Sequence, residues 1–210
     1  MYDAVLDQCE GQEGLPITRV ILETDMENIH IAPSELDLAV AEVLMQRSRN
    51  RTFILHRILE KVRPFYDFIL IDLPPSSSLL TINGLCAADL MVVCVDPSIF
   101  ALEALENLKK SFNDVRRMAR HSIHRIAAVL IRHIKPDLVS RMLGKRNASL
   151  EVEARLKEMF DTVFTVPSSE DIYEAQKKGR PLPYLAPRSK AAKAYRKIAE
   201  SIAKREDSDG

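Results

Sequence analysis

Two short, uninterrupted apolar runs constrain the fold of this chain more than any other feature. Phe68–Ile71 and Leu90–Val95 contain no charged residue, and a helix-like stretch, Leu79–Ala88, lies between them. Strands that are solidly apolar, rather than alternating, are typical of parallel sheets covered on both faces. This strand–helix–strand order favours an α/β fold in which helices cover both faces of a mostly parallel sheet.

The same alternation continues along the chain. Further strands are predicted at residues 28–32, 126–131 and 163–166, and further helices at residues 36–45, 53–62, 99–120, 150–160 and 189–204. Ser168 with Asp171 is expected to open a short helix that Gly179 ends. We therefore predict one three-layer α/β/α domain over residues 1–205, followed by a polar tail at 206–210.

Composition narrows the class of protein but does not point to a ligand. The chain has 210 residues, is 46% hydrophobic and has a formal net charge of zero, so overall charge indicates neither nucleic acid nor an anionic membrane as partner. No apolar run approaches the ~18 residues that a membrane-spanning helix needs. Cys9, Cys86 and Cys94 lack paired metal spacing, and we expect them to be reduced in a cytoplasmic protein.

Four collinear segments carry a resemblance to a known family. They are YDFILIDLPPS (66–76), LLTINGLCAAD (79–89), VDPSIFALEALENL (95–108) and VPSSEDIYEAQKKGRPLPYLAPRSKAAKAYRKIAESI (166–202). Together they resemble the ParA/MinD family of deviant P-loop ATPases, and within it the ParA/Soj branch that partitions chromosomes and plasmids. The resemblance implies a P-loop NTPase-like fold of the SIMIBI class, with ATP and Mg²⁺ as ligands.

Asp72 is the first candidate site residue. It follows the predicted strand at 68–71, and ligands of α/β proteins bind beyond the carboxyl ends of such strands. A carboxylate there can hold Mg²⁺ through a water molecule. The resemblance implies that Asp72 is the Walker B residue and that Pro74 and Pro75 begin the switch II segment. An alternative interpretation is that Asp72 only caps the next helix.

A second candidate site follows the strand predicted at 163–166. The resemblance implies that the backbone at Val166 and Pro167 contacts the nucleotide base. After the strand at 126–131, relatives often carry a small polar residue near the base, whereas this chain has Arg132 and His133. The alternative is an ordinary strand that ends at a proline.

The phosphate-binding half of the family's site has no counterpart in the 210 residues. No segment matches the GKGGxGKT loop, whose backbone N–H groups and lysine hold the phosphates. The resemblance implies that this loop and its strand would precede Met1, so we expect a gap in the sheet. Without these groups we expect no appreciable ATP hydrolysis by the chain alone.

Basic clusters are candidates for contacts with DNA, which the family binds without sequence preference. The predicted contact residues are Arg141, Lys145, Arg146, Lys177, Lys178 and Arg180, and a further cluster contains Lys190, Lys193 and Lys197. Phosphate neutralisation by such residues would make binding sensitive to salt. The alternative is a solvated basic helix face, which is the more frequent case in proteins without net charge.

Three hypotheses on function remain open at this point. The first is a truncated partition ATPase, nucleoid-associated through DNA, that works as a homodimer or with a full-length ParA-like subunit and a ParB-like centromere-binding protein. The second is a short non-catalytic paralogue that binds a partner or DNA. The third is a MinD-like positioning ATPase, which the polar end KREDSDG disfavours because it is no membrane-targeting helix.

Overall fold

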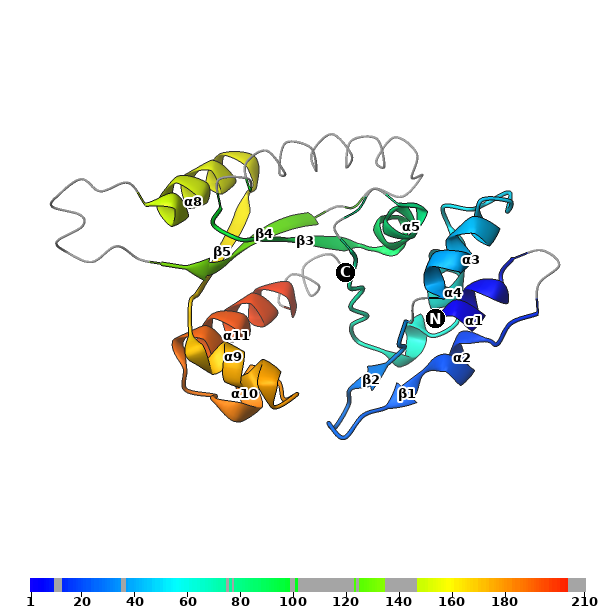
Figure 1. Ribbon diagram of the computed structural model, residues 1–210, viewed down its shortest axis with the longest axis horizontal. Helices are drawn as coiled ribbons and strands as arrows, with labels where there is room; N and C mark the ends of the chain where they lie inside the picture. Colours follow the sequence, from blue (N-terminus) through cyan, green and yellow to red (C-terminus); the bar gives the residue numbers. More distant parts are fainter. Residues whose placement is uncertain are drawn as a thin grey trace, which may run out of the picture. The chain divides into compact units, whose positions relative to one another are not determined.

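The computed structural model describes residues 1–9, 13–34, 37–74, 76, 78–98, 101, 123, 125–134 and 147–203 (Figure 1). Of the helix predicted at 99–120 only Ala101 is described, and the predicted tail lies outside the described residues. The described residues fall into two compact units, one built mainly from Met1–Asp89 and the other from Leu90 onward. The single domain over 1–205 stays a prediction.

The first unit is mostly helical. Its elements are α1 (Tyr2–Leu6), α2 (Ile17–Val20), β1 (Leu22–Glu23), β2 (His30–Ile31), α3 (Leu38–Met45), α4 (Ile54–Glu60), the 3-10 turn η1 (Arg63–Phe65) and α5 (Leu79–Ala87). The helices predicted at 36–45, 53–62 and 79–88 are confirmed as α3, α4 and α5. β2 is shorter than predicted and pairs antiparallel with β1, which the sequence pattern did not indicate.

Residues four apart on α3 and α4 form the centre of this unit's core. Ala41 and Met45 lie on one face of α3, and Ile54 and Ile58 on one face of α4, with no more than 1% of any of them exposed. Side chains at this spacing meet on the same side of a helix. They pack together with residues of α1, including Val5, so that burial of these apolar faces holds the short helices in place.

A buried amide joins α5 to the segment around the start of α4. Asn83 is 1% exposed. Its Oδ1 accepts a hydrogen bond from the backbone N–H of Leu55 at 3.1 Å, and its Nδ2 donates to the carbonyls of Arg51 at 2.7 Å and Leu79 at 2.9 Å. Both amide donors are used, so this polar side chain is buried without an unsatisfied donor.

The buried strand predicted at Phe68–Ile71 is wrong. These residues have no regular secondary structure, and Phe68, Ile69 and Leu70 are 47%, 37% and 93% exposed. A strand needs a neighbour that accepts and donates its backbone hydrogen bonds. No strand among the described residues pairs with this segment, so its apolar composition alone does not make it a strand.

The second unit contains a parallel sheet with helices on both faces. Its elements are β3 (Leu90–Val95), β4 (Arg125–His133), α8 (Ala148–Met159), β5 (Thr162–Pro167), α9 (Glu170–Lys177), α10 (Leu182–Leu185) and α11 (Lys190–Ala203). The strand order is β3-β4-β5, and every pairing in this sheet is parallel. The strands predicted at 90–95, 126–131 and 163–166 and the helices at 150–160 and 189–204 are confirmed within a few residues.

Alternation along β4 divides the core of this unit into two parts. Ala128 and Leu130 pack with Leu156 of α8 on one face, whereas Val129 packs with Ala191 of α11 on the other. Figure 1 shows α8 and α11 on opposite sides of the sheet. The predicted α/β/α layering is therefore present in this unit.

The short helix α9 begins and ends through local hydrogen bonds. The N-cap is Ser169 rather than the predicted Ser168, and its Oγ accepts from the N–H of Asp171 at 3.2 Å. Gly179, at φ +60°, ends the helix as predicted. The N–H groups of Gly179 and Arg180 bind the carbonyls of Gln176 and Ala175, which is a Schellman arrangement that needs the left-handed residue.

Candidate nucleotide site

Asp72 lies in the first unit, on the irregular segment that leads to α5. It is exposed and forms no hydrogen bond or ion pair with another residue that the structure describes. A carboxylate of this kind can accept hydrogen bonds from the waters of a hydrated Mg²⁺. Pro74, also exposed, follows on the same segment, while Pro75 lies outside the described residues.

The interpretation of Asp72 as the cap of the next helix is wrong. Ser78 is the N-cap of α5, and its Oγ accepts from the backbone N–H of Thr81 at 3.3 Å. Leu73 lies over Gly84 of α5, because a Cβ built at Gly84 would come within 2.5 Å of the Leu73 Cδ2 atom. The residue next to Asp72 is thus held against the helix, and the carboxylate of Asp72 remains exposed.

A carboxylate from α3 also caps α5. Glu42 Oε1 accepts a hydrogen bond from the backbone N–H of Leu79 at 2.6 Å. The first N–H groups of a helix have no partner within the helix, and negative charge near them is stabilising. Glu42 therefore helps to fix the beginning of α5, and with it the end of the segment that carries Asp72.

We expect Glu42→Ala to lower the free energy of unfolding by about 1–2 kcal/mol, because the Leu79 N–H loses its acceptor. Glu42→Gln keeps an oxygen at the same place and is expected to lose less than half of that. Urea denaturation of the two variants measures the difference. Equal losses for the two substitutions would contradict a role for this hydrogen bond.

The second candidate site lies at the carboxyl edge of the parallel sheet in the other unit. His133, at the end of β4, is the Cα partner of Pro167 at the end of β5, and its carbonyl accepts from the N–H of Ser168 at 3.2 Å. Val166 is fully buried in the core beneath α11. Only the backbone of Val166 could therefore contact a ligand at this edge.

A bulge near the end of β4 changes the direction of Arg132. Between the pairs Leu130–Thr165 and His133–Pro167, β4 advances by three residues and β5 by two. Arg132 has φ +50°, a left-handed conformation that costs a non-glycine residue roughly 1 kcal/mol. Its side chain is 68% exposed and its Nη2 forms an ion pair with Asp96 Oδ2, beyond the end of β3. The bulge thus places a cation at the sheet edge.

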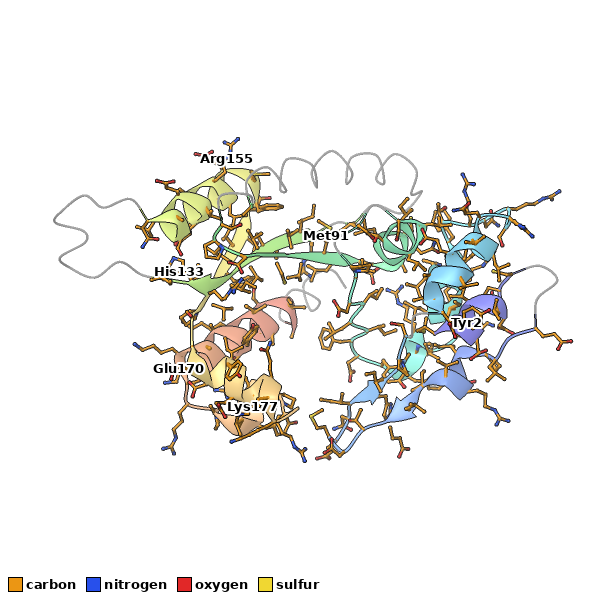
Figure 2. All side chains as sticks on the ribbon, in the orientation of Figure 1. Tyr2, Met91, His133, Arg155, Glu170 and Lys177 are labelled. Carbon is orange, nitrogen blue, oxygen red and sulfur yellow. The ribbon has the colours of Figure 1, made fainter. Side chains whose placement is uncertain are left out.

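The next residue, His133, is buried against α8. The Nε2 atom of His133, a residue that Figure 2 labels, lies 2.9 Å from Glu153 Oε2, and the two side chains form an ion pair when the imidazole is protonated. Glu153 Oε1 accepts from Lys157 Nζ at 2.6 Å. The Lys157 hydrogen bond is the main cause that lowers the pKa of Glu153. The charges of Lys157 and His133 act in the same direction, and burial opposes them.

This lowered pKa predicts an acid-dependent loss of stability. A carboxyl whose pKa is lower in the folded state stabilises the fold above its ordinary pKa near 4.5, and the stabilisation is lost as the pH falls through the folded-state value. We expect Glu153→Gln to flatten the decline of the melting temperature below about pH 4.5. Glu158→Gln on the same helix is the control, and an identical acid decline in Glu153→Gln and wild type would refute the prediction.

The predicted DNA-contact residues are only partly described. Lys177, Lys178 and Arg180 are exposed at the end of α9, but the same helix carries Glu170, Asp171 and Glu174. Arg141, Lys145 and Arg146 lie outside the described residues. The local charge around α9 is therefore nearly balanced.

The exposed basic side chains around α11 are more numerous than those at the end of α9, although the sequence alone marked them only as a further cluster. Ala191, Ala192 and Ile198 are buried under the sheet, which leaves the opposite side of the helix in solvent. The exposed basic residues of this segment are Arg188, Lys190, Lys193, Arg196 and Lys197. Lys190, Lys193 and Lys197 are three and seven residues apart, and so lie on one side of the helix.

The part of the chain that the structure describes contains no group of three or more His, Cys, Asp or Glu side chains arranged to hold a metal ion. None of the described helices is both long enough and apolar enough to cross a membrane.

The fold and site define a class of protein. Residues 2–125 match the family model described as an AAA domain. Among solved structures, cobyrinic acid a,c-diamide synthase from Mycobacterium smegmatis with bound ATP analog and magnesium is similar over 100% of this chain and 73% of its own, with TM-score 0.75 and 21% identity. The septum site-determining protein MinD from Pyrococcus horikoshii, complexed with Mg-ADP, has TM-score 0.68 at 20% identity and covers 96% of this chain and 72% of its own. The fold is therefore that of P-loop NTPases of the ParA/MinD type.

Sequence relatives narrow the class further. The sporulation initiation inhibitor protein Soj of Bacillus subtilis is 32% identical over 206 residues, which are 97% of this chain and 76% of Soj. The chromosome partitioning protein ParA of Caulobacter vibrioides is 26% identical over 209 residues, 98% of this chain and 73% of ParA. The chain belongs to the ParA/Soj family of partition ATPases.

Proposed function

We propose that this chain is a partition protein that binds a magnesium-bound adenine nucleotide and does not hydrolyse it by itself. The observation that carries the proposal is the exposed Asp72 carboxylate, which has no partner among the described residues and precedes a helix capped by Ser78. Asp72 would hold hydrated Mg²⁺, and the segment beginning with Pro74 and Pro75 would respond to the phosphates. The family membership and the Mg-ADP and ATP-analog complexes of structural neighbours support this choice of ligand.

The residues of this chain could make some, but not all, of the contacts that a magnesium-bound adenine nucleotide requires. One carboxylate suits a water-mediated contact with Mg²⁺, which retains most of its waters. The backbone at Val166 and Pro167 is proposed to contact the base at the carboxyl edge of the sheet. No GxxxxGK[ST] loop occurs in the 210 residues, which supports the proposal that they do not hydrolyse the nucleotide by themselves.

Calorimetric titration of the full chain with ADP, with and without Mg²⁺, tests the proposal. We expect Mg²⁺ to strengthen binding, and Asp72→Asn to abolish that effect while leaving magnesium-free binding unchanged. Asp89→Asn is the matched control, because Asp89 is an exposed carboxylate of the same unit that pairs with Arg63. Absence of nucleotide binding in the wild-type chain would refute the proposed ligand.

A second candidate function is a DNA-binding module, and the exposed basic residues of α11 favour it. Lysine and arginine side chains that neutralise phosphates release counterions, so affinity falls steeply with salt. We propose α11 as the main contact, and Lys177, Lys178 and Arg180 as a weaker one because acidic residues surround them. Arg141, Lys145 and Arg146 remain part of the proposed surface.

Duplex DNA binding at several salt concentrations distinguishes these contributions. Replacing Lys190, Lys193 and Lys197 by Gln is expected to reduce the slope of log affinity against log salt by roughly 2 to 3. The same change at Lys177, Lys178 and Arg180 is expected to have a smaller effect. Salt-independent binding, or no loss in the α11 variant, would count against this function.

The proposed cellular role follows from the family. We propose that the chain acts in the cytoplasm, on the nucleoid when bound to DNA. Its proposed partners are a second copy or a full-length ParA-like subunit, and a ParB-like centromere-binding protein. Co-purification with each, at matched salt, would distinguish them.

A further inference from the structure

The outward side of α3, in the first unit, carries two exposed valines. Ala41 and Met45 face the core on the opposite side of this helix, whereas Val40 and Val43 face solvent and are 54% and 56% exposed. Exposed apolar side chains are common singly on protein surfaces. These two are three residues apart, so they lie next to each other on one side of the helix and form a small apolar surface.

A basic turn, residues 46–53, extends this surface beyond the end of α3. Arg47, Arg49 and Arg51 are all exposed, and the turn contains no acidic residue. None of the three arginine side chains forms an ion pair or hydrogen bond with another residue that the structure describes. Helical backbone angles continue one residue past α3, so Arg47, four residues after Val43, lies on the side of the valines.

The backbone of the basic turn is fixed by hydrogen bonds before any partner binds. The carbonyl of Arg51 accepts from Asn83 Nδ2 at 2.7 Å, which ties the turn to α5. Within the turn, the N–H of Phe53 donates to the carbonyl of Asn50 at 3.0 Å. A surface that is already ordered loses less conformational entropy when a partner binds, so more of the interaction energy contributes to affinity.

The chemistry of the surface favours one class of partner over two others. Carboxylates accept paired N–H bonds from arginine, and an acidic helix with apolar residues at helical spacing also covers the valines. The phosphate backbone of nucleic acid would pair with the arginines but offers the valines no apolar contact. Helices that lie in a membrane surface insert larger side chains, such as tryptophan, phenylalanine and leucine.

We propose that the outward side of α3 and the basic turn form a docking surface for an acidic amphipathic helix of a partner protein. Apolar side chains of that helix, three or four residues apart, pack on Val40 and Val43, and carboxylates in its next turn pair with Arg47, Arg49 and Arg51. Charge complementarity selects this partner, because opposite charges accelerate encounter and like charges exclude other proteins. The docking surface is independent of the nucleotide proposed at Asp72.

Fluorescence anisotropy of the full chain with a labelled peptide tests the proposal. The peptide has about 14 residues, near the length at which a helix is marginally stable in water, with leucines at spacings of three and four and glutamates elsewhere. Replacing Arg47, Arg49 and Arg51 together by Gln is expected to weaken its binding by at least about tenfold. Val40→Ser combined with Val43→Ser is expected to weaken it by about fivefold.

Replacing Arg19, Lys61 and Arg63 together by Gln is the matched control for the arginine variant. These residues are exposed and carry the same charge in the same unit. We expect this control to change the affinity by less than about twofold, since separated surface charges are screened by salt. A second peptide, with lysine in place of every glutamate, is expected not to bind. Melting temperatures of the variants establish that each has folded.

Several results would overturn the docking surface. They include no binding of the acidic peptide by the wild-type chain, unchanged affinity in the arginine variant, and equal binding of the lysine peptide. Full affinity in the valine variant would show attraction by charge alone and overturn the amphipathic partner. Duplex DNA and phosphatidylglycerol vesicles are titrated with the same variants. Loss of either interaction in the arginine variant, with peptide binding unchanged, would assign the surface to nucleic acid or to a membrane instead.

Discussion

Asn83→Leu is expected to lower the free energy of unfolding by about 2–4 kcal/mol. Leucine is similar in size, but it cannot accept from the N–H of Leu55 or donate to the carbonyls of Arg51 and Leu79. These backbone groups lie in part-buried surroundings of the first unit and would lose their partner. A buried polar group that has no hydrogen-bond partner destabilises the fold by the full free-energy cost of its removal from water. Urea denaturation followed by circular dichroism measures the change.

Asn50→Leu is the matched control for this prediction. Asn50 is exposed, so the same substitution there is expected to change stability by no more than about 0.5 kcal/mol. A midpoint for Asn83→Leu that equals that of Asn50→Leu would show that the buried amide does not stabilise the fold.

Leu156→Ala is expected to destabilise the second unit by about 2–5 kcal/mol. Leu156 is fully buried between α8 and the sheet, where it packs with Ala128, Leu130 and Val152. Truncation removes apolar burial and leaves a cavity that the surrounding strands can only partly fill. Leu150→Ala on the same helix, where leucine is 41% exposed, is expected to lose less than about 1 kcal/mol. Similar midpoints for the two variants would contradict the assigned orientation of α8.

Elements with strong local signals could be predicted from the sequence. The strands β3, β4 and β5 and the helices α3, α4, α5, α8 and α11 lie where apolar runs and helical spacing placed them. Gly179 ends α9 because few other residues adopt its left-handed conformation at low cost. By contrast, α1, α2 and β1 are too short for a periodic pattern, and tertiary packing and pairing stabilise them instead.

Some features of the candidate site could likewise be predicted from the sequence, and others could not. Asp72 and Pro167 each follow an apolar run, so the order of residues along the chain was enough to choose them as candidate site residues. The ion pair of Arg132 with Asp96 and the contact of His133 with Glu153 could not, because they depend on one extra residue in β4 that no sequence pattern marks. The available signal in the sequence was Arg132 followed by His133 directly after an apolar run.

The sequence by itself determined the family, the alternation of strands and helices, and the candidate carboxylate at Asp72. These properties follow from local composition and from the order of segments along the chain. Only the tertiary structure decided that Phe68–Ile71 is exposed and not a strand, since a strand exists only where another strand pairs with it. It also decided that Arg132 points out of the sheet, since the direction of a side chain depends on the register between two strands.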